Sequence, residues 1–197
     1  MDFNLFSFDE EIESADVKIS ARKTIIQEKL QVKSFLKKEK ADIILQELPQ
    51  LGESLHIISN GSFDYFNFIP ISVKLLGGKC TDFYFSTWTM NLGNTRALIK
   101  LYDEGKIEKI NALVGLYFKK RESAVFNELY EGLKARGQKV YSNENHSKVT
   151  LLTNGVDYIT ISGSANFTSN PRIEQFSINN SKELFDFHKQ WMDEIIK

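Results

Sequence analysis

Two short motifs place side chains that can bind a phosphate in the C-terminal third of the chain. His146 and Lys148 stand two residues apart at the start of one apolar run, and Gly163-Ser164-Ala165-Asn166 follows a second run. An imidazole, an ammonium, a hydroxyl and a carboxamide can each donate a hydrogen bond to a phosphate oxygen, and Gly163 lets another backbone approach closely. Ser164 and Asn166 have an alternative role as caps of a turn, because such side chains bond readily to nearby backbone.

A hairpin is expected to bring the two motifs together. Residues 148–153 and 158–162 are typical of strands, and Asn154-Gly155 between them is a frequent hairpin turn. His146 enters the first strand and the Gly-Ser-x-Asn segment leaves the second, so both should lie at one edge of a sheet. Side chains two apart in a strand face the same way, which predicts that His146 and Lys148 project together.

Strands and helices alternate over most of the chain. Strands are predicted at residues 55–59, 81–87, 110–118, 139–141, 148–153, 158–162 and 175–178. Helices are predicted at residues 66–76, 92–104 and 123–135. A last helix, capped by Ser181, should bury a face formed by Leu184, Phe185, Phe187, Trp191, Ile195 and Ile196. This order indicates an α/β domain with a mixed β-sheet flanked by helices.

The first 50 residues are predicted to form an N-terminal extension to a domain of residues 51–197. Residues 1–16 carry six acidic side chains and no basic one, and we call this segment the acidic strap. An amphipathic helix is predicted over about residues 21–48, and Pro49 ends it.

The composition excludes several classes of protein. The chain has 197 residues and a formal net charge of −1, so it lacks the global basic character of a dedicated nucleic-acid binder. Its single cysteine excludes an internal disulfide framework and a multi-cysteine zinc site. No apolar run approaches the roughly 20 residues of a membrane span, and residues 1–11 contain no Lys or Arg, which argues against a secretory signal. We therefore expect a soluble, cytoplasmic protein that does not bind a membrane.

The two motifs resemble the signature of the phospholipase D superfamily, in which His-x-Lys, four residues and Asp are followed by Gly-Ser-x-Asn. The His146–Lys148 and Gly163–Asn166 segments match it, and Phe167-Thr168 looks like the small dimeric nuclease branch. Two features depart from the pattern. Thr153 stands where the family has Asp, and nine residues instead of the usual six separate it from Gly163. The resemblance covers about three quarters of the chain and implies one phospholipase D-like half.

The resemblance implies a phosphodiesterase, a hydrolase that needs neither metal nor cofactor, and specifically an endonuclease. His146 would attack phosphorus to give a phosphohistidine, while a second histidine protonates the leaving oxygen. Lys148 and Asn166 would hold the nonbridging oxygens, and Ser164 would add a hydrogen bond. Glu174 corresponds to a family carboxylate that orients the histidine ring.

The chain has too few suitable histidines to complete this site alone. It contains His56, His146 and His188, and only His146 stands in a His-x-Lys motif. His56 is predicted to be a core or edge residue of a strand, and His188 to be exposed on the last helix. A second copy of the chain could supply the missing half, because a two-fold dimer places the same patch of each subunit face to face. Homodimerisation is therefore a consequence of the implied mechanism.

Other strand ends and other functions remain open. Ser62 and Trp88 each follow a predicted strand, where ligands of α/β sheets gather, and are candidate substrate-binding residues. A basic run, Lys119-Lys120-Arg121, is expected in a loop that could contact a DNA or RNA backbone. The alternatives to a nuclease are a lipid or small-molecule phosphodiesterase and a catalytically inactive phosphate- or nucleic-acid-binding module.

Overall fold

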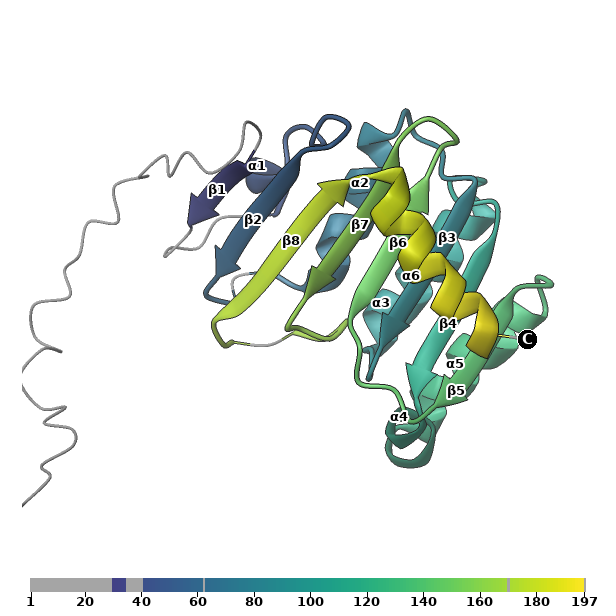
Figure 1. The fold of residues 1–197 in the computed structure, drawn as a ribbon. Coiled ribbons are helices and arrows are strands. Elements are labelled where there is room, and N and C mark those ends of the chain that lie inside the picture. Colours follow the sequence, from purple (N-terminus) through teal and green to yellow (C-terminus); the bar gives the residue numbers. More distant parts are fainter. Residues whose placement is uncertain (1–29, 35–40, 62, 170, 197) are drawn as a thin grey trace, which may run out of the picture.

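A computed structural model of the protein describes residues 30–34, 41–61, 63–169 and 171–196. In these residues eight strands form one mixed sheet in the order β1-β2-β8-β7-β6-β3-β4-β5 (Figure 1). The strands are β1 Leu30–Ser34, β2 Ser54–Ser59, β3 Asp82–Thr87, β4 Ile110–Gly115, β5 Lys139–Asn143, β6 Val149–Thr153, β7 Tyr158–Gly163 and β8 Glu174–Asn180. The helices are α1 Ala41–Ile44, η1 Tyr65–Asn67, α2 Phe68–Leu75, α3 Leu92–Asp103, α4 Leu116–Arg121, α5 Ser123–Lys134 and α6 Lys182–Ile195. The predicted α/β class with a mixed, helix-flanked sheet is confirmed.

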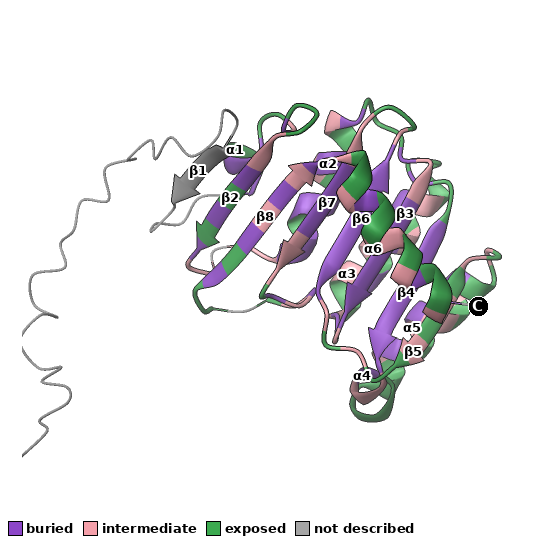
Figure 2. Cartoon of the chain, viewed as in Figure 1, coloured by how far each residue is buried: buried purple, intermediate pink, exposed green. Residues whose placement is uncertain are grey.

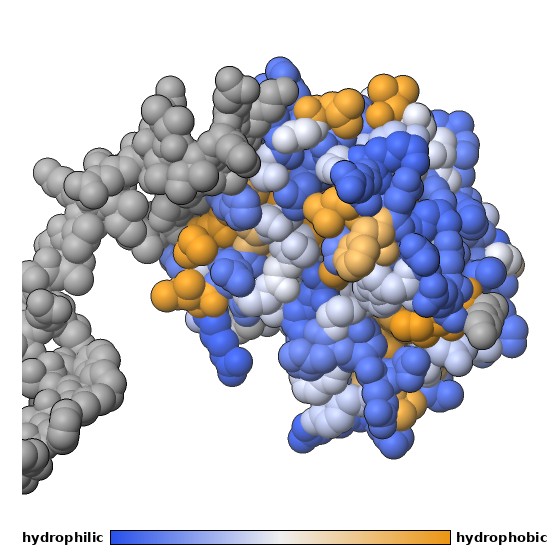
Figure 3. All heavy atoms as spheres, viewed as in Figure 1, coloured by the Kyte–Doolittle hydropathy of each residue, from blue (hydrophilic) through white to orange (hydrophobic). Residues whose placement is uncertain are grey.

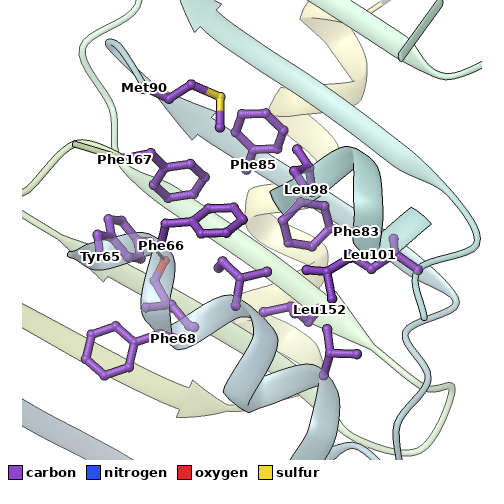
Figure 4. Close-up of a cluster of buried hydrophobic side chains, with 14 of the residues drawn as sticks. Tyr65, Phe66, Phe68, Phe83, Phe85, Met90, Leu98, Leu101, Leu152 and Phe167 are labelled. Atoms are coloured by element: carbon purple, nitrogen blue, oxygen red, sulfur yellow. Dashed lines mark hydrogen bonds between the residues drawn. The ribbon is translucent and has the colours of Figure 1, made fainter. Parts of the chain in front are cut away.

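Helices cover both faces of the sheet, but unequally. Figure 1 shows α2, α3 and α5 behind the sheet and α6 crossing its front. Strand β3 illustrates the division, because alternate side chains of a strand face opposite sides. Phe83 and Phe85 enter the larger core beneath α2, α3 and α5 (Figure 4). Tyr84 packs with α6 in the smaller core on the other face. The sheet is therefore a central layer with apolar packing on both faces.

The last helix begins and packs largely as its sequence predicts. The Ser181 hydroxyl accepts a hydrogen bond from the Leu184 backbone N–H at 3.3 Å and so caps α6. Phe185 and Met192 are buried against the sheet, but Phe187 is 64% exposed, and its predicted place on the buried face is wrong. The reason is that α6 rests against β6 and β7, so its contact stripe is narrow. Strand β2 lies beyond the helix, and its residues His56 and Ile58 are exposed (Figure 2).

The N-terminal region differs from the predicted helix. Leu30–Ser34 forms strand β1, parallel to β2, and helix α1 is confined to Ala41–Ile44. The helix predicted across residues 30–34 is wrong, because LQVKS alternates apolar and polar residues and β2 offers it an open edge. Ala41, Ile44 and Leu45 belong to the main core. The acidic strap lies outside the described residues, and the division at residue 50 stays a prediction.

The strand predicted at residues 110–118 also ends early. Strand β4 stops at Gly115, and Leu116–Arg121 forms helix α4. Its neighbours end at the same level, since Val114 pairs with Thr87 of β3 and Gly115 with Asn143 of β5. The basic residues Lys119, Lys120 and Arg121 consequently lie on α4 rather than in a loop. Among the described helices, none is long and apolar enough to cross a bilayer.

Candidate functional site

The two motifs meet at one edge of the sheet, as the hairpin predicts. Strands β6 and β7 pair antiparallel, with Val149 opposite Ser162, and the Gly163 N–H donates to the Lys148 carbonyl at 3.2 Å. This edge also holds the carboxyl ends of the parallel strands β3, β4 and β5. Ligands of open α/β sheets bind at such an edge. His146 lies in the loop that leads from β5 to β6 and is exposed there.

His146 and Lys148 are in direct contact. Strand β6 begins only at Val149, so neither residue is in the strand, yet the Lys148 Nζ lies 3.3 Å from His146 Nδ1. The same Nζ donates to the His146 carbonyl at 2.8 Å. Because an ammonium can only donate, Nδ1 accepts in this arrangement. An imidazole in the tautomer that accepts at Nδ1 carries its N–H on Nε2.

Hydrogen bonds to β3 hold the loop that carries His146. Asn145 is the centre of this anchor: its Oδ1 accepts from the Ser147 N–H at 3.0 Å and from the Ser86 hydroxyl at 3.1 Å. Its Nδ2 donates to the Thr87 carbonyl at 3.2 Å. The anchoring role of Asn145 was not predicted from the sequence. The signal for it is an asparagine directly before His146 in a loop, because asparagine side chains bond readily to nearby backbone.

Lys148 is unusually enclosed for a lysine. Its side chain is buried, with 9% of the residue exposed. Burial lowers the pKa of the ammonium from its ordinary value, and the negative charge of Glu174 opposes that shift. The ammonium is thus held in a place where water screens it poorly, which strengthens its attraction for an anion.

Ser164 and Glu174 form the opposite wall of the site. The Ser164 hydroxyl donates a short hydrogen bond to Glu174 Oε2 and accepts one from the Gln175 N–H at 3.1 Å. The Ser164 N–H donates to the Gln175 carbonyl at 3.0 Å, so the loop after β7 is tied to the start of β8. Glu174 is buried. The predicted pairing of its carboxylate with the His146 ring stays a prediction.

Gly163 and Asn166 complete the second motif. A Cβ at Gly163 would lie 2.7 Å from the Gln175 carbonyl oxygen and 2.6 Å from the Phe176 ring, so the close approach predicted there is made by β8. The Asn166 Oδ1 is buried and has no hydrogen-bond partner among the described residues. Phe167 is fully buried and anchors this loop in the core. The packing of Phe167 therefore fixes the position of Asn166 at the end of the motif.

An aromatic stack borders the site on the β3 side. The Trp88 ring lies 5.6 Å from the His146 ring and 4.6 Å from the ring of Tyr117, with which it stacks. The Arg121 guanidinium lies 5.1 Å from the Tyr117 ring centre, a cation–π contact. The structure thus brings Trp88 to the candidate site. The sequence does not indicate a role for Tyr117 at the site, because residues 110–118 are predicted to form a buried strand, in which an aromatic side chain is expected to pack in the core.

Several sequence candidates lie elsewhere. Ser62 is outside the described residues. His188 is half-buried on α6 and accepts a hydrogen bond from Trp191 Nε1 at 3.0 Å, so its predicted exposure is only partial. His56 is exposed on β2. No group of three or more His, Cys, Asp or Glu side chains that could hold a metal ion occurs in the described ranges.

Thr153, which replaces the family aspartate, supports the hairpin turn. Its hydroxyl donates to the Asp157 carbonyl at 2.7 Å and accepts from the Gly155 N–H at 2.9 Å. Gly155 has a φ of 90°, the left-handed conformation that favours glycine. Thr153 lies at the opposite end of β6 from Lys148. The surplus residues are therefore absorbed in the turn, away from the candidate site.

Comparison with solved structures identifies the fold. The phospholipase D family member Nuc from Salmonella typhimurium aligns with a TM-score of 0.53 and 15% identity, covering 73% of this chain and 94% of Nuc. NucT from Helicobacter pylori aligns with a TM-score of 0.53 and 14% identity, covering 73% of this chain and 96% of NucT. Polyphosphate kinase from Porphyromonas gingivalis aligns with a TM-score of 0.54 and 12% identity over 74% of this chain and 26% of the kinase. No family model and no curated protein matches the sequence.

Proposed function

We propose that this chain, which has the fold of phospholipase D family members, is a phosphodiesterase that cleaves nucleic acid through a phosphohistidine. The observation that carries the proposal is the contact of His146 Nδ1 with the Lys148 ammonium at 3.3 Å. It occurs at the sheet edge where Ser164 and Glu174 form the facing wall. A nucleophile, a cation and hydrogen-bond donors thus surround one small volume, as attack on a phosphodiester requires.

Substrate binding prepares His146 for attack. When a phosphate oxygen binds the Lys148 ammonium, the ammonium no longer contacts Nδ1 of His146. The ring proton can then move to Nδ1, which leaves a lone pair on Nε2. That lone pair attacks phosphorus, the bond to the leaving oxygen breaks, and the leaving oxygen takes a proton from a second histidine. Water then attacks the phosphohistidine, the P–N bond breaks, and the second histidine takes the water proton. Lys148 and Asn166 stabilise the negative charge on the nonbridging oxygens throughout.

The second histidine is His146 of another copy of the chain. A two-fold dimer places equivalent patches face to face, and His146 is exposed at the sheet edge, where a partner can reach it. The site would then contain two imidazoles and two lysines, one pair from each subunit. The proposal therefore includes a homodimer as the active form.

Nucleic acid is the substrate class that the surroundings of the site favour. The Trp88–Tyr117 stack lies beside His146, and helix α4 presents Lys119, Lys120 and Arg121 next to that stack. Aromatic rings stack on unpaired bases, and basic side chains bind the phosphate backbone. A net charge of −1 does not oppose this, because the basic residues are concentrated locally.

Cleavage assays in EDTA test the proposal. We expect the full chain to cleave DNA or RNA in chelator, His146→Ala to abolish cleavage, and His188→Ala, on α6, to retain it. Rapid denaturation of a reaction with labelled substrate at alkaline pH should leave the label on His146, because the P–N bond of a phosphohistidine is labile in acid. Activity that survives His146→Ala, or that disappears with EDTA, would refute the mechanism. Binding of nucleic acid without any turnover would identify an inactive binding module instead.

Mixing experiments test the shared site. When wild-type protein is mixed with an equal amount of His146→Ala and the subunits exchange, about a quarter of the dimers carry two intact histidines. Activity per wild-type chain should then fall to about half. Activity that stays proportional to the wild-type chain, or a chain that sediments as a monomer while active, would show that one copy suffices.

A further inference from the structure

A pocket lies beside the candidate site, on the part of the sheet that α6 leaves uncovered. It has a volume of about 550 Å³ and is lined by His56 and Ile58 of β2, Gln175 and Ser177 of β8, Ser162 of β7, and Lys148. Figure 3, which shows this face of the molecule, has largely hydrophilic and neutral atoms here, with apolar atoms at the margin. Lys148 belongs to both the pocket and the candidate site, so the two are continuous.

The strand register aligns the pocket residues in one row. His56 pairs with Ser177, Ser177 with Ser162, and Ser162 with Val149, the residue after Lys148. Paired residues lie on the same face of a sheet, and neighbouring strands are about 4.8 Å apart. His56 therefore lies about 14 Å from β6, measured across three strand spacings. The row ends at Val149, and the preceding residue, Lys148, also lines the pocket and connects it to the candidate site. The row is longer than one phosphodiester.

The chemistry of the row fits a polyanion. Among the residues that the structure describes, the lining includes one cation, Lys148, one imidazole, His56, and no carboxylate. The hydroxyls of Ser162 and Ser177 are bonded to each other at 2.9 Å, which leaves one of their protons for an outside acceptor. The side chain of Ile58, 39% exposed, offers an apolar contact at the far end.

We propose, on the basis of the proposed function, that this row binds the stretch of a nucleic-acid strand adjacent to the scissile phosphate. The Lys148 end receives the scissile phosphate, the serine hydroxyls contact the backbone, and His56 donates a hydrogen bond to a neighbouring phosphate. The enzyme then acts on a strand and prefers it to an isolated phosphodiester. His56 is a binding residue in this arrangement, not the second histidine of the chemical step.

The test compares two substrates and two variants. KM is measured in EDTA for a labelled 12-nucleotide single strand and for bis(p-nitrophenyl) phosphate, which contains one phosphodiester. In His56→Ala, which removes the donor, the ratio of the KM for the strand to the KM for the small diester should rise about fivefold, the effect of one hydrogen bond. In Lys74→Gln, which removes an exposed cation from α2 behind the sheet, the ratio should not change.

A binding measurement keeps the inference separate from catalysis. Fluorescence anisotropy gives the Kd of the same strand for His146→Ala and for His146→Ala with His56→Ala, and the double variant should bind about fivefold more weakly. Equal Kd values, or no binding by either protein, would overturn the inference even if the wild type cleaves diesters. A His56→Ala protein that loses its dimeric state, with Kd unchanged, would overturn it by assigning this face to a subunit contact. His56-dependent binding without cleavage would support the row and refute the proposed function.

Discussion

Gly115→Ala should loosen the two supports of His146 at once. Gly115 ends β4 with a φ of −65° and a ψ of 138°, which alanine adopts without strain, so only packing opposes the change. An added Cβ would lie 2.6 Å from the Trp88 carbonyl oxygen, 2.7 Å from the Trp88 ring and 3.2 Å from the Asn145 carbonyl oxygen. Trp88 packs on the His146 ring, and Asn145 holds its loop.

The expected loss of stability follows from these contacts. Overpacking against backbone costs about 1–3 kcal/mol, because a backbone atom cannot rotate away. Replacing glycine also restricts the unfolded chain, which restores about 0.4–1 kcal/mol. We expect the free energy of unfolding to fall by about 1–2 kcal/mol, the difference between these effects. In a chain of this size that lowers Tm by a few degrees, about 2–4 °C per kcal/mol.

Gly132→Ala is the matched control. Its added Cβ would also meet an atom at 2.6 Å, but this atom is the terminal Cδ1 of Ile99, which a change of rotamer can move. Gly132 lies inside α5, where alanine is favoured over glycine by about 1 kcal/mol. We therefore expect Gly132→Ala to be neutral or stabilising.

Denaturant unfolding and kinetics in EDTA measure both variants. Gly115→Ala should unfold at lower denaturant with an unchanged m-value, and its kcat should fall because His146 is less well oriented. If Gly115→Ala matched the wild type in stability and kcat, or if Gly132→Ala lost as much stability, the reasoning from these contacts would be refuted.

Three further results are expected. Tyr65→Phe should lower the free energy of unfolding by about 1–2 kcal/mol, because the buried hydroxyl donates to the Ile161 carbonyl at 2.6 Å; an unchanged denaturant midpoint would contradict this. Burial raises the pKa of the Cys80 thiol to about 12, so above about pH 8.5 the unfolded chain loses a proton that the folded protein keeps. The free energy of unfolding should then fall by up to about 1.4 kcal/mol for each pH unit above that value. Thermal melts of Cys80→Ala over the same pH range should show a smaller loss of stability. Equal pH dependence in both proteins would show that the thiol is not the cause. Asn145→Ala should reduce kcat more than it raises KM, because it frees the His146 loop, and a change confined to KM would argue against that role.

The sequence predicts the hairpin and the central strands well for physical reasons. Residues 148–153 and 158–162 are apolar runs around Asn154-Gly155, so periodicity and turn chemistry agree. The edge of the sheet is harder to predict. Strand β1 depends on pairing with the open side of β2, which is a contact between distant segments that local pattern cannot report.

The candidate site shows the same limit. The contact between His146 and Lys148 follows from spacing and hairpin geometry, and the structure contains it. The stack of Trp88 on Tyr117 joins the ends of β3 and β4, and no local pattern records that proximity. His56 was expected in a core or at an edge because its neighbours are apolar, but α6 does not extend over β2. Which face of a sheet stays open is decided by where a distant helix ends.

The position of β6 has a consequence for motion. All five of its residues are buried, and it lies between β7 and β3 with neighbours on both sides. Backbone amides in such a strand exchange with solvent only in large openings of the structure, whereas loop amides exchange through small ones. Lys148 directly precedes this slowly exchanging strand, whereas His146, two residues earlier, lies in a loop held mainly by Asn145. The side chain of His146 can therefore change its orientation over a short range without disturbing the sheet.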